Sequence, residues 1–222
     1  MKLITYFRFF IYLVKQWNFI LALYIIYYEI KGEWKYGINT SGIGFFKFNQ
    51  NGSNYLALHV GSNYYILEAL IKQLNKNKHN NTFIDMGSGK GRVMVVAAAY
   101  GFRKIIGVEF SDKLCEEAIA NITVAKKKFK SASFEVINKD ASFYKIPDDI
   151  TTFFFANPFD EAIMRRVVDN IQASWLLNPR NIRIVYLGPV YKKLFLEQGY
   201  KEVFQIGHIR KRRSINAVIL EK

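Results

Sequence analysis

The chain has 222 residues, of which 50% are apolar, 16% aromatic and 23% charged, a profile that excludes a disordered or fibrous protein. Its single cysteine, Cys115, excludes an intramolecular disulfide framework, and three separated histidines form no metal-ligand pattern, so no metal site is predicted. The formal net charge of +14 favours acidic or phosphate-bearing partners, with nucleic acid among them; biased codon usage is the alternative explanation.

Residues 1–30 are the most apolar part of the chain. Between Phe9 and Tyr28, Lys15 is the only charged residue. A helix of this length would span about 30 Å, the thickness of a bilayer core, but the central charge opposes a simple span. Lys2, Arg8 and Lys15 among aromatic residues favour a helix lying on an anionic membrane surface, which predicts a cytoplasmic protein peripheral to the inner face of the membrane. A helix packed on its own domain or on a partner subunit, and a true membrane span, are the alternatives.

Residues 31–81 are predicted to form a lid and a helical extension. The segment Gly37–Gly44 is typical of a loop, and apolar residues at helical spacing predict a helix over 62–74. The polar run 75–81 is typical of a solvated connector.

Residues 82–222 alternate between strand and helix patterns. The predicted strands are 82–85, 104–109, 133–137, 151–156, 181–187, 201–209 and 215–221, and the helices between them are 91–100, 111–128, 161–177 and 190–198. Continuous apolar strands separated by helices predict an α/β, Rossmann-like fold with a mostly parallel sheet covered on both faces. The last two strands lack an intervening helix, so the final strand is predicted to be antiparallel.

A glycine-rich loop follows the first of these strands, in the sequence Asp85-Met-Gly-Ser-Gly-Lys-Gly91. Glycines let the backbone turn tightly and approach a ligand, and the following helix presents free amide groups. A P-loop is excluded because Lys90 is followed by glycine and not by Ser or Thr. A dinucleotide-binding loop is disfavoured because its third glycine would fall at Arg92.

This loop resembles motif I of the class I S-adenosylmethionine-dependent methyltransferases, and the resemblance covers residues 82–222. It implies seven strands with an antiparallel last strand and S-adenosyl-L-methionine as cofactor. Glu109, which ends the second strand, corresponds to the acid that holds the ribose hydroxyls, and Asp140 to the acid at the adenine amino group. The cofactor-binding residues implied in this way are Asp85, Gly87, Ser88, Gly89, Gly91, Glu109, Asp140, Ala141 and Asn157.

The fourth strand ends in Asn157-Pro158-Phe159. This segment is similar to a shortened form of the Asn/Asp-Pro-Pro-Tyr/Phe motif of amino-group methyltransferases, which implies catalytic roles for Asn157 and Phe159. Acceptors on the hydrogens of an amine would aim its lone pair at the methyl group. A strand end followed by a helix-starting turn is the structural alternative. The whole pattern is similar to uncharacterised bacterial class I methyltransferases, in which Tyr36–Thr40 would form an N-terminal lid.

The function predicted from the sequence is methyl transfer by direct in-line displacement to an unidentified acceptor, with nitrogen favoured over oxygen. Arg210–Arg213, at the turn between the last two strands, would border the substrate mouth and favour a phosphate-bearing or acidic acceptor. Two alternatives remain open: a non-catalytic, membrane-associated binding module on the same fold, and an NAD-type oxidoreductase.

Overall fold

A seven-stranded sheet forms the centre of the structure, which is a computed structural model. The structure describes residues 2–16, 18–50, 53–74, 82–207 and 216–222. For residues 2–3, 43–50 and 53–60 it describes the backbone alone. The strand order is β5-β4-β3-β6-β7-β9-β8, and only β9 runs antiparallel to its neighbours. The predicted fold class, including the reversed last strand, is confirmed. The strands are β3 (Thr82–Met86), β4 (Lys104–Glu109), β5 (Ser133–Asn138), β6 (Thr152–Phe155), β7 (Arg183–Leu187), β8 (Lys201–Ile206) and β9 (Ala217–Glu221).

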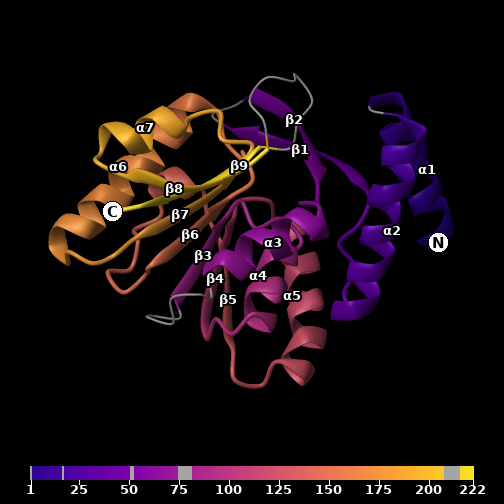
Figure 1. The fold of residues 1–222 in the computed structure, drawn as a ribbon, viewed down its shortest axis with the longest axis horizontal. Coiled ribbons are helices and arrows are strands. Elements are labelled where there is room, and N and C mark those ends of the chain that lie inside the picture. The colour runs from indigo at the N-terminus through magenta and orange to yellow at the C-terminus, as the bar shows by residue number, and fades with distance from the viewer. Residues whose placement is uncertain (1, 17, 51–52, 75–81, 208–215) are drawn as a thin grey trace.

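Helices cover both faces of this sheet, as Figure 1 shows. One face packs against α3 (Tyr64–Leu74), α4 (Arg92–Ala99) and α5 (Asp112–Lys128), and the other against α6 (Glu161–Leu177) and α7 (Lys192–Glu197). The central strand β6 buries Phe153, Phe154 and Phe155 completely, because alternate side chains enter the two apolar clusters. A short 3₁₀ helix, η1 (Ala141–Phe143), follows β5.

The N-terminal segment forms two helices, α1 (Lys2–Gln16) and α2 (Phe19–Tyr36), where the sequence predicted one. The break has a local cause: the Asn18 side chain accepts a hydrogen bond from the Leu21 amide at 2.8 Å and caps α2. The helices pack together through Phe9 and Leu13 of α1 and Ala22 and Ile25 of α2. Within the part of the chain that the structure describes, neither these helices nor any other is long and apolar enough to cross a membrane.

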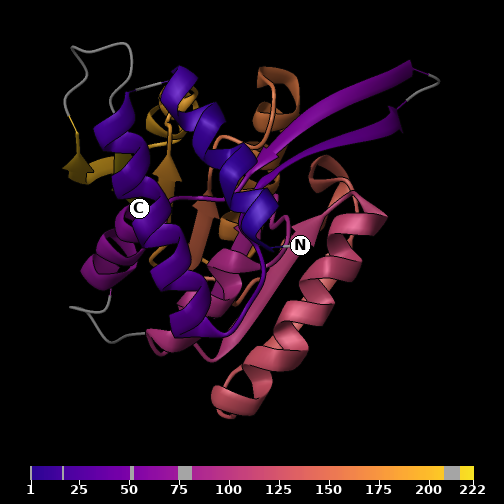
Figure 2. The same cartoon turned by 90° about the vertical axis from the view of Figure 1, so that its right-hand side faces the viewer.

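A two-stranded hairpin, β1 (Ile43–Gln50) and β2 (Ser53–Val60), occupies a region in which the sequence analysis predicted no strand. Its strands pair antiparallel from Ile43 opposite Val60 to Gln50 opposite Ser53. Figure 2 shows the hairpin projecting away from the main sheet. The hairpin joins the loop after α2 to α3. Ser41 before it and Ser62 after it both accept hydrogen bonds from Arg92, the first residue of α4, so both ends of the hairpin lie close to the N-terminus of α4.

Candidate functional site

The loop between β3 and α4 has a backbone conformation that glycine adopts without strain. Gly87, Gly89 and Gly91 have φ values of 82°, 51° and 80°. The amides of Gly87 and Ser88 both donate to the carbonyl oxygen of Val108, at 2.9 and 3.1 Å. These bonds hold the loop against the carboxyl end of β4, the edge at which open α/β sheets bind their ligands.

Two buried carboxylates stand beside this loop. Glu109, 7% exposed, accepts hydrogen bonds from the amides of Gly89, Phe110 and Ser111, each at 3.0 Å. Burial raises the pKa of Glu109, and these backbone donors oppose the rise. Asp85 is 2% exposed, and burial followed by the nearby charge of Glu109 raises the pKa of Asp85 well above its ordinary value.

Asp85 and Ser88 carry the buried polar atoms that the protein leaves unsatisfied at this site. In the described part of the chain, Asp85 Oδ2 and Ser88 Oγ have no hydrogen-bond partner. Such groups cost free energy unless a ligand or water satisfies them. A ligand with a positively charged donor group would pair with the Asp85 carboxylate, so these residues fit the ammonium end of S-adenosyl-L-methionine.

Asp140 and Ala141 lie at the same edge of the sheet, after β5. The Asp140 side chain accepts hydrogen bonds from the Ser142 amide and hydroxyl, at 2.8 and 2.7 Å, and caps η1. The Lys139 amide donates to the Glu109 carbonyl oxygen at 2.9 Å, which joins this turn to the end of β4. The structure therefore places the two acids expected at the ribose and the adenine on adjacent strand ends.

The Asn157-Pro158-Phe159 segment packs directly on the glycine loop. A Cβ atom added to Gly87 would lie 2.5 Å from Pro158 Cβ and 4.0 Å from Phe159 Cε1. Asn157 is exposed and has a φ of 49°, a left-handed conformation that asparagine tolerates better than most residues. The Tyr186 hydroxyl donates to Asn157 Oδ1 at 3.3 Å, so the amide is oriented from β7. The Asn157-Pro158-Phe159 segment and the glycine loop, which lie far apart in the sequence, are therefore in contact.

The helix-starting turn considered as the structural alternative is also present. Asp160 is the N-cap of α6, and its carboxylate accepts a hydrogen bond from the Ile163 amide at 2.9 Å. The segment after β6 therefore both starts a helix and borders the glycine loop, so the two interpretations are compatible.

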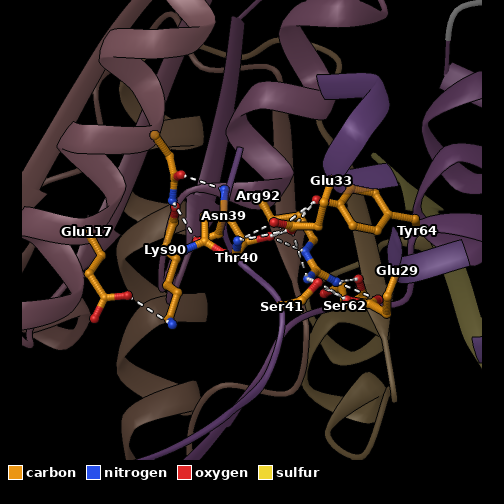
Figure 3. A network of polar contacts seen from close by, with 11 residues as sticks. Glu29, Glu33, Asn39, Thr40, Ser41, Ser62, Tyr64, Lys90, Arg92 and Glu117 are labelled. Carbon is orange, nitrogen blue, oxygen red and sulfur yellow. Dashed lines mark hydrogen bonds and ion pairs between the residues drawn. The ribbon is translucent and has the colours of Figure 1, made fainter. Parts of the chain in front are cut away.

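Sequence reasoning missed Arg92, the first residue of α4, as the centre of a buried ionic network (Figure 3). Its guanidinium makes a bidentate pair with Glu29, with nitrogen–oxygen distances of 2.8 and 2.7 Å, and lies 3.6 Å from Glu33. It also donates to Thr40 Oγ1, Ser41 Oγ and the Ser62 carbonyl oxygen. The network ties α2, the loop after it and the start of α3 to the helix that follows the glycine loop.

A second contact joins the loop after α2 to the glycine loop itself. Asn121 of α5 accepts a hydrogen bond from the Asn39 amide at 2.8 Å and donates to the Lys90 carbonyl oxygen at 3.0 Å. The Lys90 side chain pairs with Glu117 at 2.9 Å. Tyr36–Thr40, the segment expected to act as a lid, therefore lies beside the glycine loop.

Two other sequence interpretations concern single features. Cys115 is buried, its thiol donates weakly to the Glu109 carbonyl oxygen, and burial raises the pKa of Cys115 to about 11, consistent with a structural cysteine. The Arg210–Arg213 turn lies outside the described residues.

The strand order, the reversed last strand and the glycine loop with its two acids define the class I S-adenosylmethionine-dependent methyltransferase fold. More specifically, residues 59–169, half of the chain, match the model of the family described as histone methylation protein DOT1. The chain belongs to this family. S-adenosyl-L-methionine, the cofactor expected from the sequence, is confirmed as the cofactor of this fold and family.

Solved structures share this fold at low sequence identity. An O-methyltransferase from Nostoc punctiforme, described as putative, superposes with a TM-score of 0.54 at 12% identity, over 71% of this chain and 56% of that one. Magnesium protoporphyrin IX methyltransferase from Synechocystis, solved with bound cofactor, has a TM-score of 0.53 at 14% identity, over 71% and 77% of the two chains.

A third structure, the tRNA (uracil-54, C5)-methyltransferase of Pyrococcus abyssi in complex with S-adenosyl-L-homocysteine, has a TM-score of 0.51 at 16% identity. The match covers 79% of this chain and spans only 44% of the Pyrococcus chain. No curated protein sequence matches the chain. At these identities the structures establish the fold alone.

Proposed function

We propose that this protein transfers a methyl group from S-adenosyl-L-methionine to an amino nitrogen of an acidic or phosphate-bearing acceptor, by direct in-line displacement. One observation carries the proposal: the Asn157-Pro158-Phe159 turn is packed against Gly87 of the glycine loop, so an acceptor-orienting amide stands next to the cofactor loop. Within the DOT1 family, the chain would belong with members that carry Asn-Pro-Phe at this position.

Different residues around the glycine loop would bind different parts of the cofactor. Asp85 and Ser88, with their unsatisfied buried oxygens, would hold the ammonium end, and Glu109 would accept hydrogen bonds from the ribose hydroxyls. Asp140 and Ala141 would border the adenine, as the family resemblance implies. When bound, the cofactor supplies a methyl group activated by a positively charged sulfur.

Asn157 is the residue proposed to act on the acceptor. Its Oδ1 has two lone pairs; one receives the Tyr186 hydroxyl, and the other is free to accept a hydrogen from an amine. Accepting that hydrogen aims the nitrogen lone pair along the methyl–sulfur axis. In the proposed transfer the nitrogen–carbon bond would form as the carbon–sulfur bond breaks, the sulfur would leave with the bonding pair as a neutral thioether, and the methylated nitrogen would afterwards lose its extra proton to water. Phe159, half-buried beside the loop, would pack against the acceptor.

The charge of the chain supports an acidic or phosphate-bearing acceptor. With a formal net charge of +14, the protein attracts anionic molecules and repels strongly basic ones over distances of about a Debye length. The description of the family refers to histone methylation, and histones are basic proteins. The charge therefore favours a different acceptor for this member.

Calorimetric titration with S-adenosyl-L-methionine, and separately with NAD, tests the cofactor. Micromolar binding of S-adenosyl-L-methionine alone is expected, and Gly89→Arg should abolish it because the side chain would enter a loop with a φ of 51°. Binding of NAD alone would support an oxidoreductase. Cofactor binding without methyl transfer to any acceptor would favour a non-catalytic module.

Transfer of a radiolabelled methyl group tests the acceptor and the role of Asn157. Phosphoethanolamine and RNA are expected to accept methyl groups better than a lysine-rich histone peptide. Asn157→Gly keeps the left-handed backbone and removes the amide, so it should lower kcat about a hundredfold, a larger effect than any loss of cofactor affinity. Tyr186→Phe should give a smaller loss of kcat. An unchanged kcat in Asn157→Gly would refute the assignment.

A further inference from the structure

The N-terminal helices expose an unusual amount of apolar surface. Twenty large hydrophobic side chains in the described part of the chain are exposed, and half of them lie between Ile4 and Trp34. Scattered exposed apolar residues are ordinary, but a concentration of this size on two neighbouring helices indicates an interaction surface.

We call this surface the outer face. On α2 it consists of residues spaced three or four apart, so they form one stripe along the helix. Ile20 and Trp34, at the two ends of the stripe, are 80% and 86% exposed. The opposite side of α2 is buried against the protein. Figure 2 shows α1 and α2 side by side on one side of the molecule. The outer face comprises Ile20, Leu23, Tyr27, Ile30 and Trp34 of α2. Ile4, Phe7 and Ile11 of α1 form a separate exposed stripe, because Phe9 and Leu13, which pack on α2, lie on the opposite side of α1.

The charges beside the outer face are all positive. Arg8, Lys15 and Lys31 are exposed, whereas the two acids of these helices, Glu29 and Glu33, are only 2% and 5% exposed and bind inward to Arg92. The Lys31 ammonium lies 5.5 Å from the centre of the Tyr27 ring. This combination matches the surface of an anionic bilayer. The apolar residues can enter the acyl boundary, the tyrosine and tryptophan rings can lie at the headgroups, and the cations can pair with anionic lipids.

We propose that the outer face docks on an anionic membrane surface, with α2 lying in the interface. α2 has 18 residues, a length of about 27 Å, and it would lie along the surface because it does not meet the requirements for a span. A second copy of this chain is a poorer occupant, since pairing two outer faces would bring Lys15 and Lys31 toward like charges in proteins of net charge +14.

Point variants test this proposal better than a deletion of residues 1–30. The deletion would remove Glu29 and leave Arg92 without its bidentate partner, so it would disturb the fold near the glycine loop. The apolar variant is Ile20→Ser/Leu23→Ser/Trp34→Ser, and the cation variant is Arg8→Gln/Lys15→Gln/Lys31→Gln. A matched control, Leu176→Ser/Leu177→Ser, removes side chains that are 64% and 78% exposed at the end of α6.

Flotation with vesicles of phosphatidylcholine alone, or with 30% phosphatidylglycerol, is the measurement. The full chain is expected to float with the anionic vesicles at least tenfold better. Each cation near an anionic surface contributes about 1 kcal/mol, or about fivefold, so the cation variant should bind about a hundredfold more weakly. The apolar variant should lose at least tenfold, and the control should match the wild type. All variants should keep their circular dichroism spectra and cofactor affinity.

Fluorescence gives an independent readout of the contact. The emission difference between wild type and Trp34→Phe should shift to the blue when anionic vesicles are added, because Trp34 leaves water. Equal flotation with both vesicle types, or an apolar variant that floats like the wild type, would overturn the proposal. The outer face would instead be assigned to a second copy of the chain if the protein self-associated without lipid and the apolar variant abolished that association but still floated like the wild type.

Discussion

Replacing Arg92 by methionine would remove the positive charge that lies between Glu29 and Glu33 while keeping most of the side-chain length. The arginine makes five hydrogen bonds, two of them to Glu29. Burial alone would lower the pKa of Arg92, but the charges of Glu29, Tyr64 and Glu33 and the hydrogen bonds to Glu29 together outweigh it, so the pKa is raised and the guanidinium stays charged. Glu33 would keep its bonds from Thr40 and Tyr64. Glu29 would keep only the Ser41 hydroxyl among its described donors.

Breaking a buried ion pair by removing one partner costs about 3–5 kcal/mol. Domains are stable by about 5–15 kcal/mol, so Arg92→Met should lose a large fraction of the free energy of unfolding. Urea denaturation followed by circular dichroism measures this loss. Adding Glu29→Gln to Arg92→Met removes the stranded charge and should recover about 1 kcal/mol or more. A loss below about 1 kcal/mol in Arg92→Met, or a double variant less stable than Arg92→Met alone, would show that the network does not stabilise the fold.

Three further predictions concern the glycine loop and its neighbours. Gly87→Ala should weaken cofactor binding at least tenfold in calorimetry, because its Cβ would lie 2.5 Å from a proline, whereas Gly101→Ala, with a φ of 97° and open space around it, should leave binding unchanged. Burial and Glu109 raise the pKa of Asp85, so the cofactor-free protein should lose stability as pH rises from about 4 through that pKa. In urea denaturation across pH values, Asp85→Asn should lack this loss. Equal pH profiles for the wild type and Asp85→Asn would contradict the prediction. Because the pKa of Cys115 is raised to about 11, a thiol reagent at pH 8 should react only after unfolding, and rapid reaction of the folded protein would exclude this burial.

The sheet and its edge could be predicted because local patterns determine them. Continuous apolar strands such as Phe153–Phe155 and the glycines after Asp85 carry their own signals, so the strands and the positions of Glu109 and Asp140 at strand ends could be predicted. The contact between Gly87 and Pro158 could not be read from spacing. It depends on β3 and β6 being neighbours in the sheet, which brings their carboxyl ends together.

The N-terminal third was harder to predict because its signals are either weak or long-range. The dipeptide Asn51-Gly52 between two runs of eight residues is typical of a two-residue hairpin turn, and it was a usable signal for β1 and β2. Glu29 and Glu33, four residues apart, share one face of an otherwise apolar helix. Their spacing indicated a common partner, but nothing local identified Arg92, which lies 63 residues beyond Glu29.

That separation also sets an order of events during synthesis. Ribosomes add about 5–20 residues per second, so the 63 residues between Glu29 and Arg92 correspond to roughly 3–13 s of elongation. During this interval the two acids of α2 lack Arg92, the partner that they bind in the folded protein. The ionic network of α2 can therefore be completed only after β3 and the start of α4 have been made, although α2 is made first.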